Sequence, residues 1–138
     1  MTIKLSVGAV CFTAAIALSS GSIAESRGET VTPHFEQAIT NIPGKSLVTL
    51  IVDYAPGGES APHIHAKSAF IFAYVLSGKI ESQVNDESKR IYSAGESWYE
   101  RPGSSHRVSR NASDTEPAKL LAVFVVDTDD KSLTTPVE

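Results

Sequence analysis

Hydrophobic and polar residues along this chain follow the short repeat of β-strands, with no helical period of useful length. Residues 47–54, 70–76 and 119–126 are apolar runs rich in β-branched and aromatic side chains. Because they end at glycine, proline or polar turn residues, they predict strands. The near-continuous apolarity of residues 47–54 also indicates that both faces of that strand are covered.

Shorter strands are expected between these runs. Residues 63–65 form an extended piece because Pro62 biases the residue before it toward β geometry. Further short strands are expected at residues 80–84, 90–92, 98–101 and 106–109. Many short strands, with glycine or proline at nearly every turn, predict an all-β sandwich or barrel.

The two ends of the chain are expected to lie outside the barrel. Residues 1–24 have a positive start, an apolar stretch and an ending in small residues, which is typical of a cleaved secretory signal peptide. The predicted division is therefore a signal peptide (1–24), an N-terminal arm with a flexible start (25–46), the barrel (47–126) and a polar C-terminal tail (127–138). The expected location is the periplasm or the exterior, with no membrane contact after cleavage.

Composition narrows the class of protein further. The 138 residues are 41% hydrophobic and 20% charged, which is typical of one globular domain. The formal net charge is −4, and no basic stripe is present, so nucleic-acid binding has no support. The single cysteine, Cys11, leaves with the predicted signal peptide. The exported chain would then contain neither disulfides nor thiolate ligands.

Three of the four histidines indicate a metal site. His63 and His65 are two residues apart, so on an extended strand both imidazoles point to the same face. His106 follows in a second glycine-bracketed β segment. Neutral imidazoles on one face can chelate a divalent transition metal such as Fe, Mn, Ni, Zn or Cu. His34 has no second ligand nearby in sequence and is expected to be a surface or packing residue.

At three motifs the sequence resembles the cupin superfamily of small jelly-roll barrels, also called double-stranded β-helices. These motifs are His63-Ile-His65, Tyr74-Val-Leu-Ser-Gly78 and Pro102-Gly-Ser-Ser-His106. The resemblance covers residues 47–126 and is to the small single-domain kind. It implies metal ligands at His63, His65 and His106. Arg101 stands where the family has a proline, and Asn111 comes one residue late.

The family's glutamate ligand is missing from its expected position. Counting back from Gly78 places Ile71 there, and the alternative count places Ala69 or Phe70. Replacement ligands are therefore sought on nearby strands. Glu100 is the first candidate and Gln83 the second.

Other polar residues near the motifs carry less specific expectations. Glu59 lies in the Gly-Gly loop, where a solvated side chain is expected. For Glu100, the competing interpretation is a surface charge pair with Arg101 or Arg107. Tyr74 and Tyr99 are, with Glu100, the candidate acid or base groups, and with Phe72 they are candidate pocket walls. Trp98 is expected mainly in the core.

The function expected from these features is an exported metal cupin with a three-histidine site for a small, oxygen-donor, anionic ligand. Resemblance to catalytic cupins implies a metal-dependent oxidoreductase of dioxygenase type, ahead of an isomerase or lyase. The alternative is a non-catalytic binder of a small molecule or metal, and a third class is an assembly or storage protein. A homodimer is also expected as an option, because related barrels often pair edge to edge.

Overall fold

The computed structural model describes residues 25–137, which contain ten β-strands and no helix. The strands are β1 (Arg27–Ala38), β2 (Lys45–Glu59), β3 (His63–His65), β4 (Phe70–Ser77), β5 (Lys79–Val84), β6 (Arg90–Ser93), β7 (Ser97–Glu100), β8 (Ser105–Asn111), β9 (Ala118–Asp127) and β10 (Thr134–Pro136). In this part of the chain no helix is long and apolar enough to cross a membrane. The predicted signal peptide lies outside the described residues.

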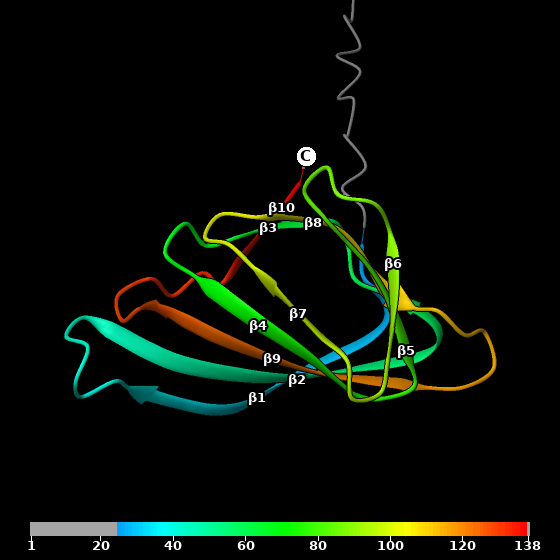
Figure 1. Cartoon of the computed structure of the whole chain (residues 1–138), viewed down its shortest axis with the longest axis horizontal. Helices are drawn as coiled ribbons and strands as arrows, with labels where there is room; N and C mark the ends of the chain where they lie inside the picture. Colours follow the sequence, from blue (N-terminus) through cyan, green and yellow to red (C-terminus); the bar gives the residue numbers. More distant parts are fainter. Residues whose placement is uncertain (1–24, 138) are drawn as a thin grey trace, which may run out of the picture.

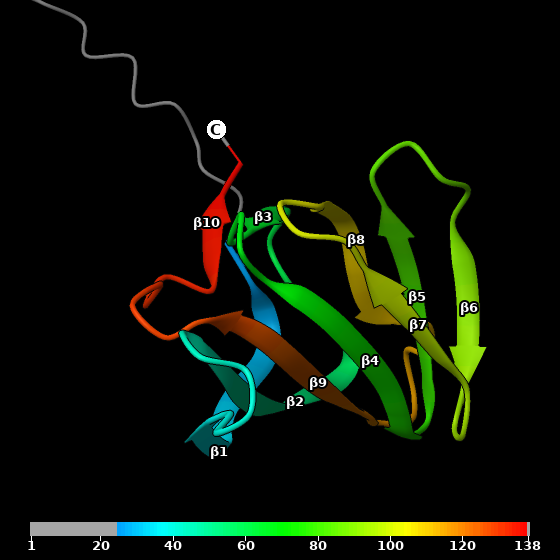
Figure 2. The same cartoon turned by 60° about the vertical axis from the view of Figure 1, so that its left-hand side comes forward.

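All ten strands belong to one antiparallel sheet that curls into a nearly closed barrel (Figure 1). One half has the strand order β1-β2-β9-β4-β7, and the other half has the order β6-β5-β8-β3-β10. The halves are joined where Glu59 of β2 pairs with Arg110 of β8. Figure 2 shows β5, β6 and β8 standing opposite β9, β2 and β1. The predicted all-β jelly roll is confirmed.

The alternation of side chains along the strands directs one face into the barrel. In β4, Ile71, Ala73 and Val75 are buried, whereas the alternate residues Phe70 and Phe72 are exposed. The same alternation in β9 buries every second residue from Ala118 to Val126. Side chains of successive strand residues point to opposite faces, so this pattern gives the barrel a continuous apolar interior. No residue from 45 to 54 of β2 is exposed, in agreement with the covered faces expected there.

The expected flexible start of the N-terminal arm is wrong. β1 pairs with β2 along nearly its whole length, from Arg27 opposite Glu59 to Ala38 opposite Ser46. No strand pattern is visible in this segment of the sequence, because most β1 residues are exposed and polar. The strand forms because β2 offers it a partner edge of backbone donors and acceptors. β2 itself runs five residues past its expected end at Tyr54.

The C-terminal segment is also more ordered than a loose tail. β10 pairs with β3, with Thr134 opposite His65 and Pro136 opposite His63. Just before it, Leu133 packs against the hydrophobic core and its carbonyl accepts a hydrogen bond from the backbone of Ala66. The short strand that carries two histidines is therefore held on both sides, by β10 and by β8.

Candidate metal centre

The three histidines of the two motifs meet inside the barrel. His63 and His65 lie on β3, and His106 on β8 is the direct cross-strand partner of His63. The ring centroids are separated by 4.8, 5.3 and 5.8 Å. One ring nitrogen from each residue lies within 4.8 Å of the others. The two-residue spacing places His63 and His65 on the same face, and the exposed Ile64 between them points outward.

Two of the imidazoles are oriented by hydrogen bonds. His63 Nδ1 lies 2.8 Å from the carbonyl oxygen of Ala61, which can only accept, so Nδ1 carries the proton and Nε2 keeps its lone pair. His106 Nε2 lies 2.9 Å from the hydroxyl of Ser82. When Nε2 donates to that hydroxyl, Nδ1 of His106 keeps its lone pair. A hydrogen bond at the far ring nitrogen is the usual way in which proteins orient a metal-binding imidazole.

His65 differs because both of its ring nitrogens are buried without a hydrogen-bond partner among the described residues. Its Nε2 lies 3.0 Å from Glu100 Oε2, but the two atoms are not aligned for a hydrogen bond, and Oε2 is also without a partner. Burying such atoms unpaired costs about 1–3 kcal/mol each. A cation between them would satisfy both lone pairs. This arrangement fits a metal ion.

Glu100 reaches the histidines from β7. It is only 2% exposed, and its Oε1 accepts a 3.0 Å hydrogen bond from Trp98 Nε1 and lies 3.4 Å from His106 Nδ1. The strand register pairs Glu100 directly with Ile71, the position where the resemblance expects a glutamate. Cross-strand partners project to the same face of a sheet, so a carboxylate on β7 can serve the space that one on β4 would fill. The charge pair with Arg101 or Arg107, considered from the sequence, is not formed.

Electrostatics in the cluster favour a cation. Burial lowers the pKa of His106 to about 4 and also lowers that of His63. Burial alone would raise the pKa of Glu100, but the nearby His65 and His106 and the Trp98 hydrogen bond outweigh it and hold that pKa at about 2. At neutral pH the site therefore combines neutral His63 and His106 imidazoles with an ionised carboxylate, as a divalent metal requires.

The other sequence-predicted residues do not join the cluster. Gln83 lies on β5 next to inward-facing Ser82, so it points outward, and its amide donates to the carbonyl of Glu87. Tyr74 and Tyr99 are on the outer face of the sheet, where Tyr74 stacks on Phe72 and Tyr99 on Phe70. His34 is exposed, as expected. Glu59 was expected in a loop, but it is the last residue of β2, where it pairs with Arg27 near the surface.

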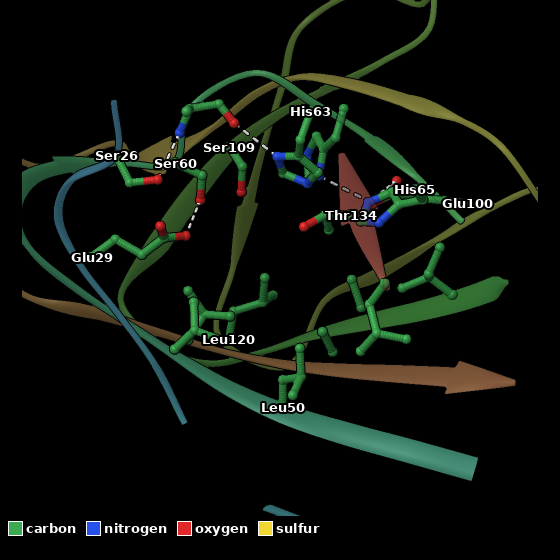
Figure 3. A pocket seen from close by; sticks show the side chains of 18 of the residues that line it. Ser26, Glu29, Leu50, Ser60, His63, His65, Glu100, Ser109, Leu120 and Thr134 are labelled. Atoms are coloured by element: carbon green, nitrogen blue, oxygen red, sulfur yellow. Dashed lines mark hydrogen bonds and ion pairs between the residues drawn. The ribbon is translucent and has the colours of Figure 1, made fainter. Parts of the chain in front are cut away.

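The histidines open onto a cavity of about 270 Å³ (Figure 3). Its walls are mostly apolar and include Leu50, Val52, Leu120 and Phe124. Such a volume lies near the small end of ligand pockets, so the cavity suits a small organic molecule. Polar groups in and around it that the sequence analysis missed are Glu29, Tyr54, Ser60, Ser82, Ser109 and Thr134. The only feature of the sequence that could have indicated Ser82 and Ser109 is the alternation along their strands, which places a small polar side chain on the inner face.

Comparison with known proteins agrees with this architecture. The Cupin domain family matches residues 50–124, more than half of the chain. An oxalate oxidase solved in complex with glycolate is 25% identical with a TM-score of 0.58, and the match covers 78% of this chain and 56% of that one. An uncharacterized conserved protein from Klebsiella pneumoniae with a double-stranded β-helix domain is 20% identical with a TM-score of 0.62, covering 86% and 89% of the two chains.

This chain thus corresponds to little more than half the length of the oxalate oxidase. No curated protein sequence matches it. The structural similarity at 20% identity shows only a shared fold. The family match is a match of sequence, and it covers the residues that form the barrel. By that match the chain belongs to the cupin family.

Proposed function

We propose that this cupin holds one divalent transition metal, chosen from Fe, Mn, Ni, Zn and Cu, through His63, His65, His106 and Glu100. The observation that carries the proposal is the pair of buried, unpartnered atoms, His65 Nε2 and Glu100 Oε2, 3.0 Å apart. Imidazole and carboxylate donors together suit these metals. In this proposal Glu100 on β7 is the carboxylate ligand, in place of the glutamate that the family has at the Ile71 position of β4.

A metal bound there would polarise a ligand oxygen and, if redox-active, exchange single electrons. The residues around the site hold the proposed metal ligands in position. The Ala61 carbonyl and the Ser82 hydroxyl orient two of the imidazoles, and Trp98 Nε1 holds one oxygen of Glu100. The apolar walls of the cavity exclude water from the ligand, which strengthens electrostatic attraction inside the site.

The ligand that this site fits is a small organic acid or other oxygen-donor anion. Glycolate in the oxalate oxidase neighbour is a ligand of this kind. The reaction proposed is oxygenation by O₂, in which two C–O bonds form while the O–O bond and one C–C bond of the substrate break. Both oxygen atoms enter the products, so no external reductant is needed. The second candidate is a non-catalytic binder, which the mostly apolar cavity would serve equally well.

Metal content and oxygen consumption together test the proposal. Protein purified from its native compartment should contain about one metal ion per chain by elemental analysis. An oxygen electrode, run over diketones, catechols and hydroxy acids with the metal-free protein as control, should detect uptake with some of them. Ligand binding without oxygen uptake would favour the binder. Metal-free native protein that also takes up none of these ions would reject the metal site.

Export and self-association are also proposed on sequence grounds. The signal-peptide pattern of residues 1–24 supports export. The exported protein should therefore begin at Glu25 when its N-terminus is sequenced. Recovery of an intact Met1 from the soluble cytoplasm would contradict it. Homodimerisation rests on the behaviour of related barrels, and sedimentation analysis of the purified protein would measure it.

A further inference from the structure

The wall of the cavity away from the metal centre carries a second carboxylate. Figure 3 shows Glu29 and Ser60 on one side of the cavity, and His65 and Glu100 on the other. Glu29 comes from β1, and its Oε1 accepts a hydrogen bond from Ser60 Oγ. Both residues line the same cavity as the histidines. A ligand bound at the metal centre would therefore have this wall at its other end.

The hydroxyl groups behind Glu29 form a directed chain. Tyr54 OH lies 2.6 Å from Ser60 Oγ and 2.8 Å from Ser109 Oγ. Because Ser60 donates its proton to Glu29, it must accept from Tyr54, and Tyr54 in turn accepts from Ser109. Burial, partly offset by these two hydrogen bonds, raises the pKa of Tyr54 to about 12, so the phenol remains a donor. Each hydroxyl proton thus points toward the carboxylate.

The second oxygen of Glu29, Oε2, is left for a ligand. Within residues 25–137 it has neither a hydrogen-bond donor nor an ion-pair partner, whereas the neighbouring Arg27 is paired with Glu59. Glu29 is only partly buried, and it lines the cavity together with Ser26 and Ala61. This end of the cavity therefore presents an acceptor with no matching donor on the protein.

The backbone holds Glu29 in this place by a close approach of two glycines. The pairing of β1 with β2 shifts register between Arg27 and Glu29, and Gly28 in the shift has a φ of +60°. A side chain on Gly58 would place its Cβ only 2.5 Å from the Gly28 carbonyl oxygen. Only glycine allows that contact. The irregularity turns the Glu29 side chain toward the cavity beside Ser60.

We propose that Glu29 selects ligands whose end remote from the metal carries a hydrogen-bond donor, an ammonium group above all or else a hydroxyl. This inference rests on the proposed metal site, which binds the anionic head of the ligand. The ligand class is then a small organic acid with a cationic or hydroxylated tail. A dicarboxylate such as malate is disfavoured, because its second negative charge would face the Glu29 carboxylate across an apolar cavity.

Four acids that share one chelating 2-hydroxycarboxylate head test this assignment. They are 2-hydroxybutanoate, 2,4-dihydroxybutanoate, 4-amino-2-hydroxybutanoate and malate, which end in methyl, hydroxyl, ammonium and carboxylate groups. Binding to the full exported chain loaded with Zn²⁺ is measured by calorimetry, so no turnover is needed. The amino acid should bind about tenfold more tightly than the methyl compound, because its ammonium group can donate a charge-assisted hydrogen bond to Glu29. Malate should bind most weakly, because its second carboxylate would face Glu29.

Glu29→Gln should reduce the preference for the ammonium tail to about twofold and improve malate binding, with zinc content unchanged. Glu36→Gln is the matched control, because Glu36 lies on the same strand at the exposed surface. If all four acids bind the wild-type protein equally, or malate binds as tightly as the amino acid, the role of Glu29 is wrong while the metal site stands. If none binds and zinc is not retained, the proposed function fails as well.

Discussion

Each end of the cavity presents a carboxylate with one hydrogen-bonded oxygen and one oxygen without a partner among the described residues, but the groups around the two carboxylates differ. Glu100 lies among imidazoles, with its Oε2 and both nitrogens of His65 unpartnered within the described chain. Glu29 lies at the end of a hydroxyl chain in which Ser60 and Tyr54 each have partners. At the first end, lone pairs of several residues converge on one point, which suits a cation. At the second end, a single carboxylate oxygen can accept a hydrogen bond from a ligand.

This difference shows why carboxylates of one cavity can serve different purposes. Unpaired lone pairs from several residues around one point favour a metal ion, whose charge they share. A single carboxylate oxygen supported from behind by hydroxyl groups favours a directional hydrogen bond instead. Four changes test the comparison, and they follow in order of decreasing effect.

The largest effect is expected at the imidazoles. Replacing both His65 and His106 with alanine should reduce metal content from about one ion per chain to almost none, since two of the proposed ligands are removed. Elemental analysis after dialysis measures this. His34→Ala is the matched control, because His34 is exposed on β1 and should leave metal content unchanged. Full metal content in the double variant would place the site elsewhere.

Replacing Glu100 with glutamine should weaken metal binding by about 10- to 100-fold. The amide keeps the shape of the side chain and can still accept the hydrogen bond from Trp98 Nε1, but it removes the negative charge. A competition titration with a chelator measures the affinity, and Glu36→Gln controls for a general change in charge. Unchanged affinity with unchanged folding would remove Glu100 from the set of ligands.

The stability of the metal-free protein should fall with decreasing pH in two steps. His106 binds its proton at about pH 4 when folded and near 6.5 when unfolded, so the unfolded chain holds more protons between these values and stability is lost as pH falls. Glu100, with a folded pKa of about 2 against 4.5, adds a second loss below pH 4.5. Urea unfolding from pH 7 to pH 3 measures both. Stability that stays flat between pH 6.5 and 4 would contradict the assigned burial of His106.

The smallest effect is expected at the opposite wall. Tyr54→Phe removes the hydroxyl that links Ser60 and Ser109 and should lower the free energy of unfolding by about 1–3 kcal/mol. Metal affinity should stay within about twofold of wild type, because the hydroxyl touches no proposed metal ligand. Tyr99→Phe, at an exposed tyrosine, is the control for the urea measurement. A large loss of metal with this change would mean that the two ends are coupled.

Several features could be predicted from the sequence because they depend on local patterns. Alternating and β-branched runs identified the main strands of both halves, including the segments that became β4 and β9. The two-residue spacing of His63 and His65 placed both imidazoles on one face, and glycine-bracketed motifs brought His106 into the same group. Glu100 was found as a candidate because a carboxylate was missing at Ile71 and another lay close to His106 in sequence.

Other features depended on pairings between residues far apart in the chain, which no local pattern records. The polar β1 became a strand only because β2 offered it an edge, and the tail formed β10 because β3 was free to pair. The strand register sets Glu100 opposite Ile71 and so places its carboxylate inside the barrel. Gln83 lies at an outward-facing position of β5 and cannot reach the same space. Glu29 reached the cavity through the contact of Gly28 with Gly58, thirty residues away. Such contacts are decided by sheet register and backbone approach, and so only the tertiary structure could assemble the second wall of the site.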